Sequence, residues 1–160
     1  MQCPDGIIAH LAGPYEGRRN DTGILTDSAF TMFMASKLQL WGMNLVMYAD
    51  AGYLGNSVTF IAPHTQRHGV SLTPDQVAEN LRMSNMRVCV EHAFGKICNL
   101  WPYVMHYRQL KTMLQPVGLY YRLAVLLTNC HTCLYGCQTS DAFSFRPPTL
   151  HHYLGIPNTD

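Results

Sequence analysis

Hydrophobic and polar residues alternate along this chain in two different patterns, and each pattern predicts one type of secondary structure. Short apolar runs bounded by turn residues indicate strands, and longer stretches with apolar residues three or four positions apart indicate helices. The expected strands cover 7–11, 44–49 and 58–62, and the expected helices cover 22–40, 74–100 and 116–135. Because strands and helices alternate, the pattern predicts an α/β fold.

Two of the predicted helices have clear start signals. Asp21 stands where a helix cap is expected, with its carboxylate at the positive end of the first helix. Ahead of the second helix, Thr73 can cap the first turn and Gln76 completes a capping box, while Pro74 suits the first helical position. We therefore expect the second helix to begin at Pro74 and to end before Trp101.

One predicted strand ends in an unusual way. The apolar run at 45–48 stops at Asp50, and Gly52 follows. An ordinary turn explains this, since Asp and Gly are common turn residues. Alternatively, Asp50 is held at the carboxyl end of a buried strand in order to bind a ligand, which requires a second acidic group to meet it.

A polar line on the second helix supplies a candidate for that group. It consists of Asn80, Ser84, Arg87 and Glu91, which are spaced four, three and four residues apart. This spacing places all of them on one helix face. Spacing alone favours a solvated stripe with Arg87 and Glu91 as an exposed pair. The alternative is a seam turned inward towards Asp50, which small and aromatic residues around Glu91 support.

Composition narrows the function classes. The 160 residues suffice for one domain with a hydrophobic core. Charged residues make up 13%, whereas about a quarter is usual in soluble domains. The surface is therefore either rich in uncharged polar groups or incomplete, with apolar area that a partner or further chain would cover. The net charge of +1 excludes a strong positive field over the whole chain.

The charges that are present are unevenly distributed. Residues 92–140 contain four basic side chains and no acidic one: Lys96, Arg108, Lys111 and Arg122. This stretch could face an anion, although ordinary solvated surface is the favoured interpretation.

The cysteines bear on the compartment and on metal binding. They are Cys3, Cys89, Cys98, Cys130, Cys133 and Cys137. Because no signal peptide and no apolar run of about 18 residues is visible, we expect an intracellular chain, nuclear or cytoplasmic, with reduced thiols. The spacing of Cys130, Cys133 and Cys137 also allows a zinc site, but no second ligand pair stands out and buried thiols are favoured.

Four segments carry a resemblance to a known family. In chain order they read PDGIIAHLAGPYEGRRNDTGILTDSAF, then YADAGYLG with APH after it, then NLRMSNMRVCVEHAFGKI, and then LAVLLTNCHTCLYG. Together they resemble the DDE superfamily endonucleases, which comprise Harbinger-type transposases and the nucleases derived from them. The resemblance extends from Cys3 to Gly136, and the strand-end Asp combined with the Arg-x-x-x-Glu-x-x-Phe-Gly helix is its most specific part.

The resemblance implies an RNase H-like fold in which two Asp and one Glu hold two divalent cations, Mg²⁺ or Mn²⁺, that cut DNA. Carboxylates suit this task because hard cations prefer oxygen ligands. By position Asp50 resembles the second Asp and Glu91 the Glu, so both are expected catalytic residues and metal ligands. Arg87 would orient Glu91 or touch a DNA phosphate, and Lys96 is a further expected DNA contact. Asp21 matches another acidic position, where a helix cap is favoured and metal binding is a minor role.

The family's first Asp is expected upstream of Cys3, and Asp5 sits in a Pro-Asp-Gly turn that cannot obviously replace it. We therefore expect a truncated RNase H-like fold over 1–136, a mixed sheet flanked by helices without its first central strand, followed by an irregular tail over 137–160. Such a chain would be an inactive nuclease on its own. A partner protein or a further N-terminal segment would cover the exposed sheet edge. A gene-model fragment, a decayed transposon and a domesticated protein all fit this expectation.

Two other functions stay open at this point. The chain could be a non-catalytic remnant that binds DNA or a protein through the basic 92–140 region. A weaker alternative is a small helical zinc protein built on Cys130, Cys133 and Cys137.

Overall fold

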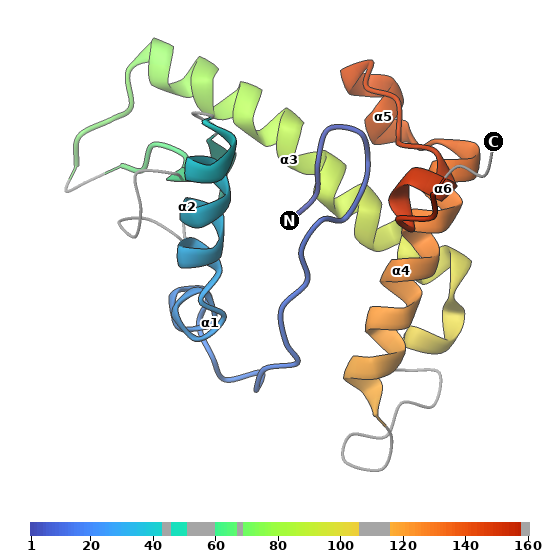
Figure 1. The fold of residues 1–160 in the computed structure, drawn as a ribbon. Helices are drawn as coiled ribbons and strands as arrows, with labels where there is room; N and C mark the ends of the chain where they lie inside the picture. The colour runs from blue at the N-terminus through green and yellow to red at the C-terminus, as the bar shows by residue number, and fades with distance from the viewer. Residues whose placement is uncertain (43–45, 51–59, 67–68, 106–115, 158–160) are drawn as a thin grey trace. The chain divides into compact units, whose positions relative to one another are not determined.

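The computed structural model describes residues 1–42, 46–50, 60–66, 69–105 and 116–157 (Figure 1). Helices dominate this part of the chain, and its named strands form a two-stranded parallel sheet. In chain order the elements are α1 (Asp21–Asp27), α2 (Phe30–Trp41), β1 (Met47–Tyr48), β2 (Phe60–Ile61), α3 (Pro74–Leu100), the 3₁₀ helix η2 (Pro102–Val104), α4 (Val117–Tyr135), α5 (Gln138–Phe143) and α6 (Leu150–Tyr153). The chain divides into two compact units: unit 1 is Met1–Ala12 with Cys89–Asp160, and unit 2 is Gly13–Val88.

The parallel sheet lies in unit 2. Its register places Met47 opposite Phe60 and Tyr48 opposite Ile61. The pairing continues one residue past β1, because the Ala49 backbone N–H donates to the Ile61 carbonyl at 2.9 Å. Helices α1 and α2 bury a hydrophobic cluster against the sheet, formed by Leu25, Phe30 and Met34 with Met47 and Phe60 packed on it. The helices thus fix the two strands whose carboxyl ends lead into the candidate site.

The cap of α1 lies one residue earlier than predicted. Asn20, not Asp21, is the cap, because its side-chain oxygen accepts a hydrogen bond from the Gly23 backbone N–H at 2.8 Å. Asp21 is the first helical residue, so its carboxylate still stands in the first turn near the positive end of the helix.

The first predicted helix is also interrupted, which gives α1 and α2 in place of one continuous helix. The break falls at Ala29, which adopts a left-handed conformation with φ 50. The Ser28 hydroxyl stabilises the break, since it donates to the Leu25 carbonyl at 2.9 Å and accepts from the Phe30 N–H at 3.3 Å. These bonds supply partners for backbone groups near the break.

The two long helices confirm their predictions. α3 begins at Pro74 and ends at Leu100, before Trp101. Its capping box is formed in both directions: the Thr73 hydroxyl accepts from the Gln76 N–H at 3.3 Å, and the Gln76 side chain accepts from the Thr73 N–H at 3.0 Å. The last long helix was predicted over 116–135, and α4 covers Val117–Tyr135 with Pro116 at its cap position.

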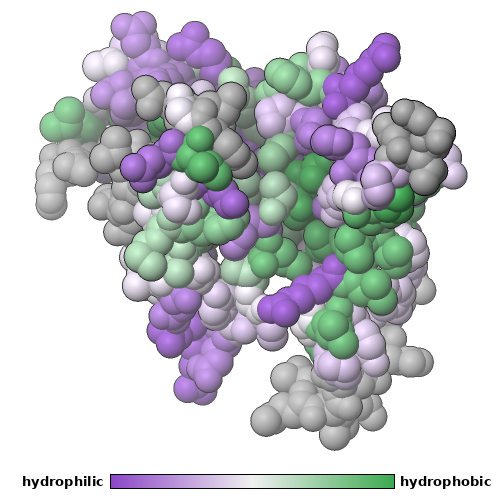
Figure 2. Space-filling model, viewed as in Figure 1, coloured by the Kyte–Doolittle hydropathy of each residue, from purple (hydrophilic) through white to green (hydrophobic). Residues whose placement is uncertain are grey.

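Unit 1 has its own hydrophobic core where the end of α3 meets η2 and α4. The buried cluster contains Ile97, Val104, Ala124 and Val125, with Ile8, Leu11, Trp101 and Tyr121 packed around it. The Trp101 indole N–H donates to the Thr128 hydroxyl at 2.9 Å, so the residue after α3 is bonded directly to α4. Several leucines of α4 stay exposed, and Figure 2 shows hydrophobic residues gathered on the surface over this helix.

The predicted strand over 7–11 does not form. Ile8 makes an isolated antiparallel bridge with Gln2. In place of a neighbouring strand, the Asn129 side chain binds the Ile8 backbone, accepting from its N–H at 2.9 Å and donating to its carbonyl at 3.0 Å. An amide side chain can therefore satisfy the two backbone groups that a strand partner would otherwise satisfy.

The tail beyond Gly136 is more regular than predicted. It contains α5 and α6, and α6 packs beside α4 (Figure 1). The Cys137 thiol and the Ser140 hydroxyl form a capping box at the start of α5. The Asn129 amide reaches the Tyr153 hydroxyl of α6 at 2.9 Å. The structure thus ties α6 to the core of unit 1, while the division of the chain at residue 136 stays a prediction.

The fold class is confirmed in its coarse form, as helices together with a small parallel sheet. Of the predicted strands 44–49 and 58–62, residues 44–45 and 58–59 lie outside the described residues. No helix among the described residues is long and apolar enough to cross a membrane.

Candidate functional site

Asp50 stands directly beyond the carboxyl end of β1 and forms an ion pair with α3. Its Oδ2 lies 3.2 Å from Nη2 of Arg87. The Asp50 side chain is 54% exposed and that of Arg87 34%, so both groups reach solvent while they touch each other. The strand-end carboxylate therefore has a helix partner, and that partner is one of the polar residues singled out by spacing.

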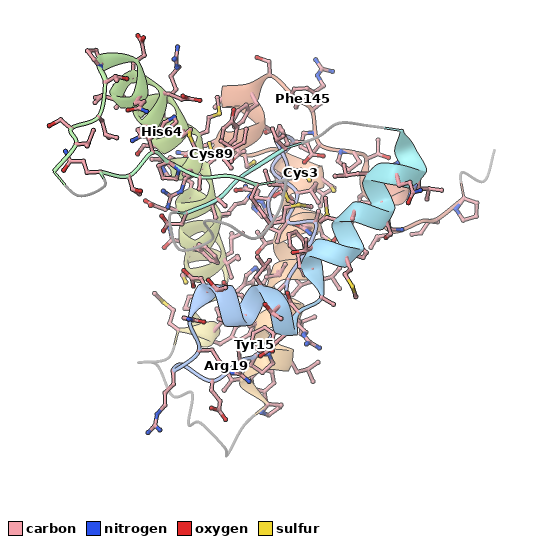
Figure 3. All side chains as sticks on the ribbon, turned by 90° about the vertical axis from the view of Figure 1, so that its left-hand side faces the viewer. Cys3, Tyr15, Arg19, His64, Cys89 and Phe145 are labelled. Atoms are coloured by element: carbon pink, nitrogen blue, oxygen red, sulfur yellow. The ribbon has the colours of Figure 1, made fainter. Side chains whose placement is uncertain are left out.

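A second contact joins α3 to the segment that follows β2. The Asn80 side-chain oxygen accepts from the His64 backbone N–H at 2.8 Å, and the Asn80 nitrogen donates to the His64 carbonyl at 2.9 Å. The His64 ring also lies against the neighbouring acidic residue, with Nε2 2.9 Å from Oε2 of Glu79. Figure 3 shows His64 beside the first half of α3.

These two contacts decide between the interpretations of the polar line. Asn80 and Arg87 are seven residues apart, about two helical turns, and each binds the segment after one of the two parallel strands. Since parallel strands present their carboxyl ends at the same sheet edge, α3 is anchored to that edge at two points. A purely solvated stripe is therefore wrong for Asn80 and Arg87, whereas the side chains of Ser84 and Glu91 are exposed.

Glu91 follows Arg87 by one turn of α3 and belongs to unit 1. It lines a cleft of about 500 Å³ in that unit, together with Lys96, His131 and Gln138 among others. The cleft brings a carboxylate, an ammonium group and an imidazole ring to one surface. The shared role of Asp50 and Glu91 as metal ligands stays a prediction.

Lys96 already has two partners inside unit 1. Its ammonium group donates to the Thr132 hydroxyl at 2.9 Å and to the Gly136 carbonyl at 3.1 Å. Both acceptors lie at the carboxyl end of α4, where free carbonyls and the negative end of the helix dipole favour a cation. Burial lowers the pKa of Lys96 below its usual value. Lys96 thus binds polar groups at the carboxyl end of α4. Its expected contact with DNA stays a prediction.

The other acidic candidates have local roles. Asp5 accepts a hydrogen bond from the Ile7 backbone N–H at 3.0 Å, as expected for a turn residue. Asp21 lies in the first turn of α1. The minor metal-binding role of Asp21 stays a prediction.

The thiols give no support to the zinc alternative. Cys130, Cys133 and Cys137 are free cysteines of intermediate burial. In the part of the chain that the structure describes, no group of three or more His, Cys, Asp or Glu side chains is gathered closely enough to hold a metal ion. Burial, followed by the neighbouring Cys130, raises the pKa of Cys133.

The basic stretch at 92–140 has two of its four cations among the described residues. Arg108 and Lys111 lie outside the described residues, and Lys96 is bonded to α4. Arg122 is exposed on α4. Of the two cations in this stretch that the structure describes, Lys96 is partly buried and Arg122 is exposed.

The sequence analysis identified Asn80 and Arg87 and gave Asp50 as the alternative target of the polar line, but it missed the partner of Asn80. His64 stood in the quoted APH segment without an assigned role. The available signal was its place shortly after a predicted strand, which matches the place of Asp50 after the other strand. Asn129 was missed as well, because a single amide within a helix carries no pattern that predicts a distant backbone partner.

A family model described as DDE superfamily endonuclease matches residues 1–129. The matched range includes the whole sheet and all of α3, and with them the ion pair of Asp50 and Arg87. No protein with a curated description and no solved structure matches the chain.

Proposed function

Because the chain belongs to the DDE superfamily endonuclease family, we propose that it is a divalent-metal-dependent DNA nuclease domain with Asp50 and Glu91 as two of its metal ligands. The observation that carries the proposal is the ion pair between Asp50 and Arg87. It ties a strand-end carboxylate to the helix that bears Glu91, one turn further along. The RNase H-like fold belongs to the same proposal, and the parallel strand pair with its covering helices supports it.

The donor chemistry of Asp50 fits a hard cation. Its carboxylate is more than half exposed and already lies against the positive guanidinium of Arg87, so this position accommodates a cation. Carboxylate oxygens are the ligands that Mg²⁺ and Mn²⁺ prefer. When bound, the metal would supply an activated water and charge stabilisation for phosphodiester hydrolysis. Asp50 and Glu91 are two ligands only, so we expect them to hold a single ion weakly.

DNA is the substrate that this proposal implies, and Arg87 and Lys96 are its proposed contacts. The planar guanidinium of Arg87 matches the geometry of a phosphate group. An ammonium group has three N–H donors, and two of those on Lys96 have partners at the end of α4. The third donor would be directed to a phosphate of the DNA backbone.

Titration calorimetry with Mn²⁺ tests the metal ligands directly. We expect Asp50→Asn and Glu91→Gln each to weaken Mn²⁺ binding by about tenfold or more, since losing even an outer-shell partner costs that much. Asp75→Asn on α3 and Glu16→Gln serve as matched controls, because both remove an exposed carboxylate elsewhere. Wild-type affinity in both site variants would overturn the proposal.

A second candidate function is binding without cutting, through the 92–140 region. The observation that favours it is the apolar surface of α4, which exposes Leu119, Leu123, Leu126 and Leu134. Three of these leucines, at 119, 123 and 126, share one helix face that a protein partner could cover. DNA binding without metal is tested by a gel shift in EDTA at increasing salt, since counterion release needs no active-site cation. Absence of a shift at low salt would leave a protein as the partner.

A further inference from the structure

The ion pair of Asp50 and Arg87 has the features of an exchangeable contact. Nη2 of Arg87 lies 3.2 Å from Oδ2 of Asp50. Both side chains reach solvent, with 54% and 34% of their surface exposed. Ion pairs of this kind contribute little to stability and are screened by salt, so a competing cation can displace the guanidinium.

A divalent cation at Asp50 would compete with Arg87 in two ways. It would take oxygen lone pairs of the carboxylate, one of whose oxygens now faces the guanidinium. It would also repel the positive charge of Arg87 at close range. Arg87 must therefore weaken metal binding at Asp50. Because the coupling between two groups that compete for one carboxylate is reciprocal, bound metal must also weaken the ion pair between Asp50 and Arg87.

We propose that Arg87 is the built-in counterion of Asp50, and that metal loading transfers it from this carboxylate to a phosphodiester of the nucleic-acid substrate. This inference rests on the proposed function, since it requires that Asp50 binds a cation. Arginine has five N–H donors and no acceptor, so once displaced it needs another anionic partner. A backbone phosphate matches its planar donors. Metal and nucleic acid would thus strengthen each other's binding through one side chain.

The first test is Mn²⁺ calorimetry on the full chain and on three variants. We expect Arg87→Met to tighten Mn²⁺ binding by about two- to fivefold, the range that corresponds to an exposed ion pair. Arg82→Met is the matched control, because Arg82 is an exposed arginine on the same helix, and we expect a clearly smaller change from it. Asp50→Asn should abolish most of the binding.

The outcomes separate the two claims. If Asp50→Asn binds Mn²⁺ as wild type does, Asp50 is not a metal ligand, so that part of the proposed function fails and the inference fails with it. If Asp50→Asn loses binding while Arg87→Met binds no more tightly than Arg82→Met, the metal site stands and the counterion role is overturned. Far-ultraviolet circular dichroism of each variant shows that the helices are intact.

The second test measures the affinity for a short DNA duplex by fluorescence anisotropy, with EDTA and with Ca²⁺, a hard cation that also prefers oxygen ligands. In EDTA we expect Arg87→Met to bind like wild type, and in Ca²⁺ we expect it to bind several-fold more weakly. An equal loss under both conditions would show that Arg87 contacts DNA independently of Asp50, which would overturn the transfer. No loss under either condition would overturn it as well.

Discussion

The side chain of Asn80 holds His64 by both backbone groups, with distances of 2.8 and 2.9 Å to its N–H and carbonyl. His64 belongs to the segment after β2, just as Asp50 belongs to the segment after β1. Asn80 therefore joins α3 to the segment after β2, and Arg87 joins the same helix to the segment after β1. The difference lies in the chemistry, because the amide forms two directed hydrogen bonds whereas Arg87 forms an exposed ion pair.

The amide of Asn80 leads to the first prediction. We expect Asn80→Ala to lower the free energy of unfolding by about 1 kcal/mol, because both hydrogen bonds are lost at an exposed site where water can partly replace them. Asn80→Asp keeps the acceptor but sets a carboxylate against the His64 carbonyl, and we expect a cost at least as large. Urea denaturation measures both changes. Asn85→Ala on the exposed part of the same helix is the control and should alter stability by no more than about 0.5 kcal/mol.

The sequence predicts an element accurately when interactions between residues close in sequence determine that element, and less accurately when tertiary contacts determine it. α3 was predicted correctly at both ends because its signals are local: the capping box joins Thr73 and Gln76, three residues apart. The break between α1 and α2 was missed, since Ala29 in a left-handed conformation has no local signal and Ala is a strong helix former. Packing of Phe30 against Phe60 gives a tertiary reason that a local pattern does not contain.

In the candidate site, too, local spacing was predicted correctly while tertiary partners were harder to predict. The spacing of the polar line identified Arg87 and Asn80 as neighbours on one face, but spacing alone favoured solvent as their partner. The alternative of a seam turned towards Asp50 named the actual partner of Arg87, whereas the partner of Asn80 is the backbone of His64, which only the fold reveals. The segment at 7–11 was predicted as a strand for a similar reason: its apolar run is real, but its hydrogen-bond partner is Asn129.

Asn129 is the basis of the second prediction, and it lies in unit 1. The residue is 2% exposed, and its amide serves the Ile8 N–H, the Ile8 carbonyl and the Tyr153 hydroxyl. We expect Asn129→Leu to cost about 3 kcal/mol or more in unfolding free energy, because three partly buried polar groups lose their partner. Thermal or urea denaturation measures the loss. Asn99→Leu at an exposed position of α3 is the control, and an equal effect at both positions would contradict the role of Asn129.

A substitution at Tyr153 tests one hydrogen bond of Asn129, the one that its amide donates to the Tyr153 hydroxyl. We expect Tyr153→Phe to cost about 1 kcal/mol, since a single hydrogen bond between α4 and α6 is removed while the ring can still pack. Hydrogen exchange should then show faster exchange in α6 with little change in the middle of α4. Unchanged protection of α6 would contradict a direct tie between the two helices.

The third prediction concerns pH and His131. Burial, with the charge of Lys96 as a second cause, lowers the pKa of His131 below 6.5. The unfolded chain therefore binds this proton more readily than the folded chain does. Stability from neutral His131 is complete above pH 6.5 and is lost as the pH falls through the lowered pKa of the folded state. We expect His131→Gln to reduce the loss of stability between neutral and acid pH, measured by urea denaturation across that range.

A comparison at alkaline pH controls for packing at this position. There His131 is neutral in both states, so any difference between wild type and His131→Gln reports the change of side chain alone. Subtracting this difference leaves the contribution of the proton. Identical pH profiles for the two proteins, after that subtraction, would contradict the lowered pKa of His131.

The fourth prediction separates the two roles assigned to Lys96. Its bonds to Thr132 and Gly136 predict that Lys96→Met lowers the unfolding free energy by about 1 kcal/mol, because the end of α4 loses a donor. The proposed DNA contact predicts in addition that the slope of log affinity against log salt falls by about 0.9 in magnitude, one phosphate contact on duplex DNA. Denaturation measures the first effect and anisotropy at several salt concentrations the second. A changed stability with an unchanged slope would make Lys96 a structural residue and would leave Arg87 as the proposed phosphate ligand.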